Sequence, residues 1–202
     1  MTARERRRAV VIAGHRGDVD LVARHLADDD PTVRASALNA LERVGALTDA
    51  QIVAATADPE AIVRRHAAEL AGKRPGLSLD GLLADDDPTV VEVAAWACGE
   101  QERVDDSTLT ALIDLTTGAD DPLVREAGAA ALGAIGDPRG LPAVLAACTD
   151  KPHVRRRAVL ALAPFEGPEV DAAIGRALED RDWQVRQAAD DLRRVTDATD
   201  AP

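Results

Sequence analysis

Aromatic side chains are nearly absent from this chain of 202 residues, which contains two tryptophans, one phenylalanine and no tyrosine. A core without large rings gains its stability from many modest contacts, and small residues allow helices to approach closely. The chain also contains only two cysteines, Cys98 and Cys148. This number is too small for the disulfide framework of a secreted domain or for a cysteine-based metal site. We therefore expect both thiols to be buried and reduced, as in a cytoplasmic protein.

Positive charge and long apolar runs are scarce as well. Lysine and arginine number 24 against 36 aspartates and glutamates, so the formal net charge is −12. This balance argues against nucleic acid or an anionic membrane as the main partner, because binding phosphates needs clustered positive charge. A protein or peptide partner, basic rather than acidic, suits the charge better. The apolar run at residues 9–13 is too short for a secretion signal, and no stretch could span a membrane.

A short motif recurs along the chain: aspartate and proline, one variable residue, then valine and arginine. Its clearest copies begin at Asp30 and Asp121, and looser copies begin at Asp58, Asp87, Lys151 and Asp182. The starting positions are separated by 28, 29, 34, 30 and 31 residues. A period of this length is typical of proteins built from stacked repeats. No segment shows the sustained alternation of apolar and polar residues that would predict a β-strand.

Each copy has the chemistry of a helix start. The aspartate can accept hydrogen bonds from free N–H groups of the first turn, and proline is well tolerated at the first helical position. Apolar residues follow at helical spacing, for example Val33, Ala37 and Leu41, and Gly45 is placed to end that helix. A shorter apolar segment precedes each of these helices. We therefore predict six helical hairpins that stack into one core, preceded by a single helix at about residues 3–13.

The run Asp-Pro-x-Val-Arg-x-x-Ala-x-x-Ala-Leu-x-x-Ile-Gly, which stands at residues 121–136 and nearly as clearly at 30–45, resembles the HEAT repeat in its short, phycobilisome-lyase-type variety. The resemblance covers about residues 15–195. It implies an all-α fold, a right-handed α-α superhelix of the armadillo and HEAT type. Residues 1–195 would form a single solenoid and 196–202 a frayed tail. It also implies a ladder of aspartates and arginines between neighbouring repeats, formed by Asp30, Arg34, Asp58, Arg64, Asp121, Arg125, Asp182 and Arg186.

The third copy departs from this pattern. Val91 stands where the others have arginine, Glu92 follows it, and the helix ends in Cys98-Gly99-Glu100-Gln101 without the usual Ile-Gly. An irregular repeat in the middle of an array is compatible with a binding site, with a change in superhelix curvature, or with simple drift of the repeat.

Enzymes with repeats of this type give an alternative function. Deoxyhypusine hydroxylase holds iron with His-Glu pairs, whereas the nearest approach in this chain is His66 and Glu69, three residues apart on one predicted helix. A bilin lyase handles a pigment, to which nothing beyond the repeat points. An alkylpurine DNA glycosylase needs a cationic groove and aromatic residues, which this acidic chain lacks. We therefore predict no catalytic residue, metal site or cofactor, and keep a lyase or oxidoreductase of this branch as the alternative.

In solenoids of this type the second helices of the hairpins line the concave face, which is the usual binding surface. Two positions on each second helix, two and six residues after the repeated valine, share a helical face and vary between repeats. Trp96 and Leu160 form an apolar centre there, bordered by charged residues, a layout typical of protein-binding surfaces. The alternative is that Trp96 fills a gap in the stack. The candidate partner-binding residues are Arg65, Glu69, Glu92, Trp96, Glu126, Arg156 and Leu160, with Ala35 equivalent to Arg65 in the first hairpin.

These observations predict a cytoplasmic, monomeric scaffold or adaptor without catalytic activity. It would hold a protein or peptide on its concave face, with Glu92 and Glu126 attracting basic side chains of the partner. It would use no cofactor and bind neither nucleic acid nor membrane.

Overall fold

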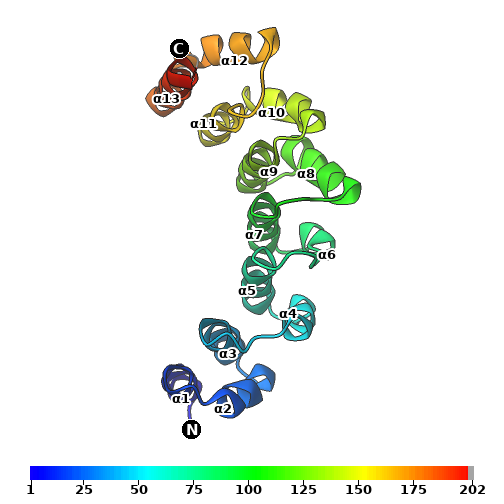
Figure 1. Cartoon of the computed structure of the whole chain (residues 1–202), viewed down its shortest axis with the longest axis vertical. Coiled ribbons are helices and arrows are strands. Elements are labelled where there is room, and N and C mark those ends of the chain that lie inside the picture. Colours follow the sequence, from blue (N-terminus) through cyan, green and yellow to red (C-terminus); the bar gives the residue numbers. More distant parts are fainter. Residues whose placement is uncertain (200–202) are drawn as a thin grey trace. The chain divides into compact units, whose positions relative to one another are not determined.

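The computed structural model describes the backbone of residues 1–199 and the side chains as far as Val195. Every regular element in this part of the chain is a helix (Figure 1). α1 spans Ala3–Arg16, and shorter and longer helices alternate after it. The first helices of the hairpins are α2 (Val19–Arg24) with its continuation η1 (His25–Ala27), α4 (Asp49–Thr56), α6 (Asp80–Leu83), α8 (Asp106–Gly118), α10 (Leu141–Ala147) with the preceding turn η2 (Pro138–Gly140), and α12 (Pro168–Leu178). The second helices are α3 (Pro31–Arg43), α5 (Ala61–Ala71), α7 (Pro88–Gly99), α9 (Pro122–Ile135), α11 (Pro152–Ala161) and α13 (Trp183–Thr199).

The chain forms two compact units, residues 1–94 and the residues from 95 onward, and the boundary falls inside α7. In the first unit α3 lies between α1 and α5, while α2 and η1 pack on α3 and α4 packs on α5 (Figure 1). In the second unit α11 lies between α9 and α13, while α8 packs on α9, α10 on α11 and α12 on α13. Each unit therefore has one layer of first helices and one layer of second helices.

The last helix reaches beyond the predicted end of the repeats. α13 continues to Thr199, so residues 196–199 of the predicted tail are helical, and residues 200–202 lie outside the described part of the chain. None of the described helices combines the length and the apolar character needed to cross a membrane.

Small residues let the helices of the second unit pack closely. Gly133 on α9 faces Ala161 on α11, and a Cβ atom on Gly133 would lie 2.5 Å from the Cβ and 2.6 Å from the Cα of Ala161. Gly128 faces α8 in the same way, since its Cβ would lie 2.5 Å from Thr116 Oγ1. Only a residue without a Cβ permits approaches this close. Ala158, fully buried on α11, belongs to the same core, which is made of many short contacts between small side chains.

The recurring aspartate–proline pair starts second helices as the sequence predicts. The Asp30 carboxylate accepts a hydrogen bond from the Thr32 N–H at 2.9 Å, and that of Asp121 accepts one from the Leu123 N–H at 2.8 Å. Proline occupies the first turn of both helices, where its missing N–H costs no hydrogen bond. Gly136 ends α9 in the left-handed backbone region with a φ of 69°.

An arginine of each regular second helix holds an aspartate of the next hairpin. In the first unit, Arg34 donates from Nε and Nη2 to both carboxylate oxygens of Asp58, at 2.8 and 2.7 Å. In the second unit, Arg155 holds Asp180 at the same two distances, and the Arg155 side chain is only 9% exposed. Such bidentate contacts between ionised groups are stronger than ordinary hydrogen bonds. The pairs of this kind are Arg34–Asp58, Arg64–Asp85, Arg125–Asp150 and Arg155–Asp180, and Arg6 of α1 holds Asp28 in the same way.

Three of the aspartates implied for this ladder have another role, so the prediction was wrong for them. Asp30, Asp121 and Asp182 each accept a hydrogen bond from the N–H two residues later, at the start of a helix. The aspartate that pairs with arginine lies earlier in the loop, as Asp28 does before Asp30. A capping carboxylate faces the first turn of its own helix, so the arginine of the preceding hairpin pairs with the earlier residue instead.

The ladder is interrupted in α7 and stops at Arg186. Val91 replaces the arginine of α7, and Ala119 replaces the aspartate before α9, so the sequence supplies neither charge at this step. Arg186 donates from Nη1 to the main-chain carbonyls of Asp180 and Arg181, and its other nitrogens have no partner among the described residues. The implied rung at Arg186 therefore has no carboxylate partner among the described residues. Nη1 of Arg186 donates to main-chain carbonyls just as Nη1 of the paired arginines does. Among the described residues, however, no further loop with an aspartate follows α13.

Candidate interaction surface and cavities

Three of the predicted partner-binding residues belong to the first unit. Arg65 and Glu69 are exposed on α5, one turn apart, and Glu92 is half-buried in the part of α7 that belongs to this unit. Glu69 lies 3.7 Å from the ammonium group of Lys73, and both side chains are 51% exposed. An ion pair this exposed adds little stability. Ile62, three residues before Arg65, adds an exposed apolar side chain to the same face.

The other four predicted residues belong to the second unit. Trp96 lies on the last part of α7, Glu126 on α9, and Arg156 and Leu160 on α11. Trp96 is 44% exposed and Leu160 is 39% exposed, so each is partly packed and partly open to solvent. Glu126 and Arg156 are half-buried.

The three helices that carry these residues are neighbours. A Cβ atom on Gly99 of α7 would lie 3.2 Å from the Cα of Ala131 on α9, and α9 packs directly against α11. Trp96, Ala130 and Leu160 occupy equivalent positions on the three helices, six residues after the repeated valine. The small side chain of Ala130 therefore separates two larger apolar side chains on one face of the second unit.

The structure adds two residues that the sequence interpretation missed. Leu123 is 50% exposed and shares a face of α9 with Glu126 and Ala130, at spacing i, i+3 and i+7. Arg157 of α11 lies beside α9, with its Nε 3.7 Å from Glu126 Oε1. Leu123 could have been found from the sequence. It stands just before the repeated valine, two helical turns before Ala130, and so lies on the same face of the helix. Arg157 could be paired with Glu126 only once the two helices were placed side by side.

One equivalent position differs from the prediction. Ala35 on α3 is 3% exposed, whereas the equivalent Arg65 on α5 is exposed. A single methyl group is easily covered by its neighbours, so a position that exposes arginine need not expose alanine. The positions two residues after the repeated valine are therefore not all exposed to solvent.

The nearest approach to a metal-binding motif has local partners. His66 Nδ1 lies 2.9 Å from the main-chain carbonyl of Ile62, and Glu69 faces Lys73. Within the part of the chain that the structure describes, no three His, Cys, Asp or Glu side chains are grouped so that they could hold a metal ion. Because a stable metal site needs several converging ligands, His66 and Glu69 do not form one by themselves.

Comparison with protein families identifies the repeat. The family model for HEAT repeats matches residues 78–163, and that for the PBS lyase HEAT-like repeat matches residues 154–180. This chain is a HEAT-repeat protein. The resemblance of the recurring motif to the short, phycobilisome-lyase-type repeat is thereby confirmed. A search of the curated proteins found no match.

Solved structures share the fold of this HEAT-repeat protein. YibA of Escherichia coli matches it with a TM-score of 0.58 at 20% identity, over 84% of this chain and 67% of YibA. A chain of the Kap95:Nup1 complex matches with a TM-score of 0.56 at 16% identity, over 87% of this chain but only 29% of that one. Human deoxyhypusine hydroxylase in complex with glycerol matches with a TM-score of 0.50 at 19% identity, over 96% and 79% of the two chains. Identities this low show the all-α HEAT-type fold and transfer no function.

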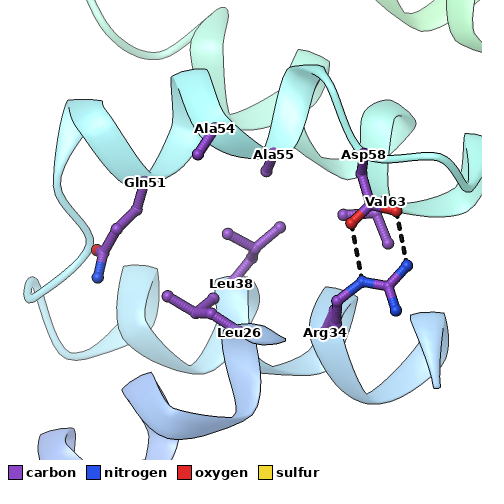
Figure 2. A pocket seen from close by; sticks show the side chains of 8 residues that line it. All are labelled: Leu26, Arg34, Leu38, Gln51, Ala54, Ala55, Asp58 and Val63. Carbon is purple, nitrogen blue, oxygen red and sulfur yellow. Dashed lines mark hydrogen bonds and ion pairs between the residues drawn. The ribbon is translucent and has the colours of Figure 1, made fainter. Parts of the chain in front are cut away.

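A cavity of about 140 Å³ lies between the first two hairpins of the HEAT-repeat protein. Apolar side chains of η1 and α3 face those of α4 across it, the Arg34–Asp58 pair lies at one end and Gln51 at the other (Figure 2). The Asp58 carboxylate is bonded to Arg34, and Gln51 Oε1 accepts a hydrogen bond from the Thr48 N–H. The polar groups of this cavity are thus largely used by the fold. Its lining residues are Leu26, Arg34, Leu38, Gln51, Ala54, Ala55, Asp58 and Val63.

A larger cavity of about 380 Å³ lies beside the equivalent Arg155–Asp180 pair in the second unit. Hydrogen bonds from Arg155 hold the pKa of the Asp180 carboxyl below its usual range, so this carboxylate stays charged and paired. Cys148 is only partly buried at the edge of the cavity, whereas Cys98 is completely buried. Burial raises the pKa of the Cys148 thiol to about 11, against a smaller opposing effect of Arg176, so the thiol is protonated at neutral pH. The lining residues are Cys148, Thr149, Arg155, Ala173, Arg176, Ala177, Asp180 and Arg181.

Proposed function

We propose that this protein is a non-catalytic scaffold or adaptor whose second unit binds a protein partner on the face formed by α7, α9 and α11. The supporting observation is Trp96, one of two tryptophans in the chain, which is 44% exposed on this face. Leu123 and Leu160, 50% and 39% exposed, lie on the neighbouring helices. Partly exposed aromatic side chains within a polar border are typical anchors of protein interfaces, because they bury a large area at low entropic cost.

The charges around this apolar centre limit the chemistry of the partner. Glu126 is 18% exposed and faces Arg157 at 3.7 Å, so part of its charge is balanced within the protein. The chain as a whole carries a formal net charge of −12, which favours association with a basic segment. The partner would place an apolar side chain against Trp96 and basic side chains at the border. Arg65, Glu69 and Glu92 would make separate contacts from the first unit.

The proposal includes the surroundings in which the protein works. Cys98 and Cys148 are both free thiols, which suits a reducing compartment such as a cytoplasm. The protein would act there as a monomer, with the face around Trp96 free for the partner. No cofactor takes part in a scaffold of this kind.

The test is an affinity capture from the native cell with wild-type protein and two variants. Trp96→Ala removes the anchor, and Trp183→Ala removes a tryptophan that is 65% exposed at the start of α13, outside the proposed face. We expect a defined protein to be retained by the wild type and by Trp183→Ala but lost from Trp96→Ala, with circular dichroism showing that all three are folded. A photo-crosslinking residue at position 130 would then join the partner directly.

Two outcomes would overturn this function. One is that no protein is captured specifically by the folded wild type. The other is that Trp96→Ala, combined with Leu160→Ala, retains the same protein as well as the wild type does, because the apolar centre would then have no part in binding.

A further inference from the structure

The cavity beside the Arg155–Asp180 pair has the size of a small-molecule site. Its volume of about 380 Å³ falls within the range of natural ligand pockets, which begins near roughly 300 Å³. Ala173 and Ala177 give it an apolar wall on α12. The cavity lies entirely within the second unit and apart from the helix face that contains Trp96.

Two guanidinium groups of the cavity form no hydrogen bond or close ion pair with the described residues. All three guanidinium nitrogens of Arg155 are used by the fold, because Nε and Nη2 donate to Asp180 and Nη1 donates to the main-chain carbonyl of Asp150. Arg176 and Arg181 also line the cavity, and both are exposed. Neither side chain has a hydrogen bond or a close ion pair among the described residues, and Arg181 contributes only a weaker attraction to the Asp180 carboxylate. Each guanidinium has five N–H donors in a planar fork that matches the oxygens of a carboxylate or phosphate. The acidic lining residue, Asp180, is already bonded to Arg155.

The equivalent cavity of the first unit shows that these arginines are not required by the repeat. Counted from the paired aspartate, Arg176 occupies the place of Ala54, four residues before it, and Arg181 occupies the place of Pro59, one residue after it. Both cavities retain the arginine–aspartate pair. The repeat therefore forms without cations at these two places, and packing alone gives no reason for the arginines of the second unit.

We propose that the cavity lined by Arg176, Arg181 and Cys148 binds a small organic oxyanion, a phosphate monoester or a carboxylate with a compact apolar group. The two guanidinium groups hold the oxyanion by charge-assisted hydrogen bonds. The apolar part lies against Ala173 and Ala177. Thr149 Oγ1, whose hydrogen is donated to the Ala146 carbonyl, remains able to accept a hydrogen bond from the ligand. This inference is independent of the proposed scaffold function.

The first experiment measures binding of phenyl phosphate, benzoate and benzyl alcohol to the whole chain by isothermal titration calorimetry. We expect one or both anions to bind the wild type at one site, while benzyl alcohol, of similar shape but neutral, binds at least about tenfold more weakly. The double variant Arg176→Gln, Arg181→Gln should weaken anion binding by at least about tenfold. Arg103→Gln, at an exposed arginine of the second unit outside the cavity, removes one positive charge, half the change made by the double variant, and should leave binding unchanged.

Cys148 provides an independent readout inside the cavity. Alkylation by iodoacetamide, followed by peptide mass spectrometry, reports on Cys148, while the completely buried Cys98 serves as an internal reference. The bound anion should slow alkylation of Cys148 in the wild type and in Arg103→Gln but not in the double variant.

The inference is overturned if neither anion binds the wild type, if benzyl alcohol binds as tightly as the anions, or if the folded double variant retains full affinity. Binding without protection of Cys148 would also overturn it, because the anion would then lie elsewhere. The relative affinities of phenyl phosphate and benzoate distinguish a phosphate ligand from a carboxylate.

Discussion

The two cavities share one architectural element and differ in nearly everything else. In both units an arginine of a second helix holds an aspartate of the next hairpin through two hydrogen bonds of 2.7 to 2.8 Å. Around the Arg34–Asp58 pair the cavity is small and mostly apolar, whereas beside Arg155–Asp180 it is larger and contains two additional arginines. The pair joins neighbouring hairpins, and the remaining lining positions are free to vary. The comparison indicates that functional residues of this molecule are to be looked for at repeat positions whose side chains differ between the two units.

The largest expected effect comes from breaking the element that the two cavities share. Arg34→Met and Arg155→Met each leave a partly buried aspartate without its cation, and each should lower the free energy of unfolding by about 2–3 kcal/mol. Arg186→Met is the matched control, because Arg186 has only main-chain acceptors among the described residues and the change should cost less than about 1 kcal/mol. Urea denaturation followed by circular dichroism measures the three values. Equal losses in all three variants would show that the carboxylate partner is unimportant.

The next largest effect on stability is expected from adding a methyl group at glycines where helices pack closely, compared between the two units. Gly133→Ala places a Cβ against the backbone of Ala161 and should cost about 1–3 kcal/mol. Gly14→Ala in the first unit should cost less, because one of its two close contacts, at 2.8 Å, is the flexible end of Arg43. Gly175→Ala, in open space within α12, should instead stabilise by up to about 1 kcal/mol. Thermal unfolding ranks the three variants, and a neutral Gly133→Ala would contradict the close packing of α9 on α11.

A smaller effect concerns how the stability contributed by the Arg6–Asp28 pair, at the start of the first unit, depends on pH. Hydrogen bonds from Arg6 lower the pKa of the Asp28 carboxyl from 3.8 to about 2. A lowered folded-state pKa contributes stability that is complete above the ordinary pKa and is lost as the pH falls towards 2. Arg6→Gln should therefore be less stable than the wild type at pH 7, and the difference should shrink between about pH 5 and pH 2. Urea midpoints measured across this range provide the check, and a difference that stays constant with pH would contradict it.

The smallest effect on stability comes from making the first cavity resemble the second. Ala54 is exposed, so Ala54→Arg should change the free energy of unfolding by less than about 0.5 kcal/mol. It places one guanidinium where Arg176 stands in the second unit, but it should create no binding of phenyl phosphate, because the cavity of about 140 Å³ is too small to enclose the ligand. Ala57→Arg, an exposed position outside the cavity, adds the same charge and should add no binding site. Each change is introduced into the double variant Arg176→Gln, Arg181→Gln, so that calorimetry measures binding at the first cavity alone.

Much of the fold could be predicted from local chemistry, but part of the candidate site could not. The Asp30–Pro31 start of α3 was predictable, because capping depends on residues two or three apart in the chain. The partner of Arg34 was not, because Asp58 lies 24 residues away and several aspartates of the loops are chemically equivalent in the sequence. Likewise, the outward position of Trp96 followed from helical spacing, while its 44% exposure depends on how the neighbouring helices cover the ring.

The sequence by itself determined the repeat, the all-α class and the places where helices begin, because periodicity and helix capping are properties of short segments. It also determined the acidic character of the chain and the scarcity of aromatic anchors. Only the tertiary structure decided which aspartate each arginine holds, that Glu126 faces Arg157, and that Arg176 and Arg181 line one cavity without a hydrogen bond or close ion pair to the described residues. Those relations join residues of different helices, and the distance between two side chains on different helices depends on packing, which no local pattern encodes.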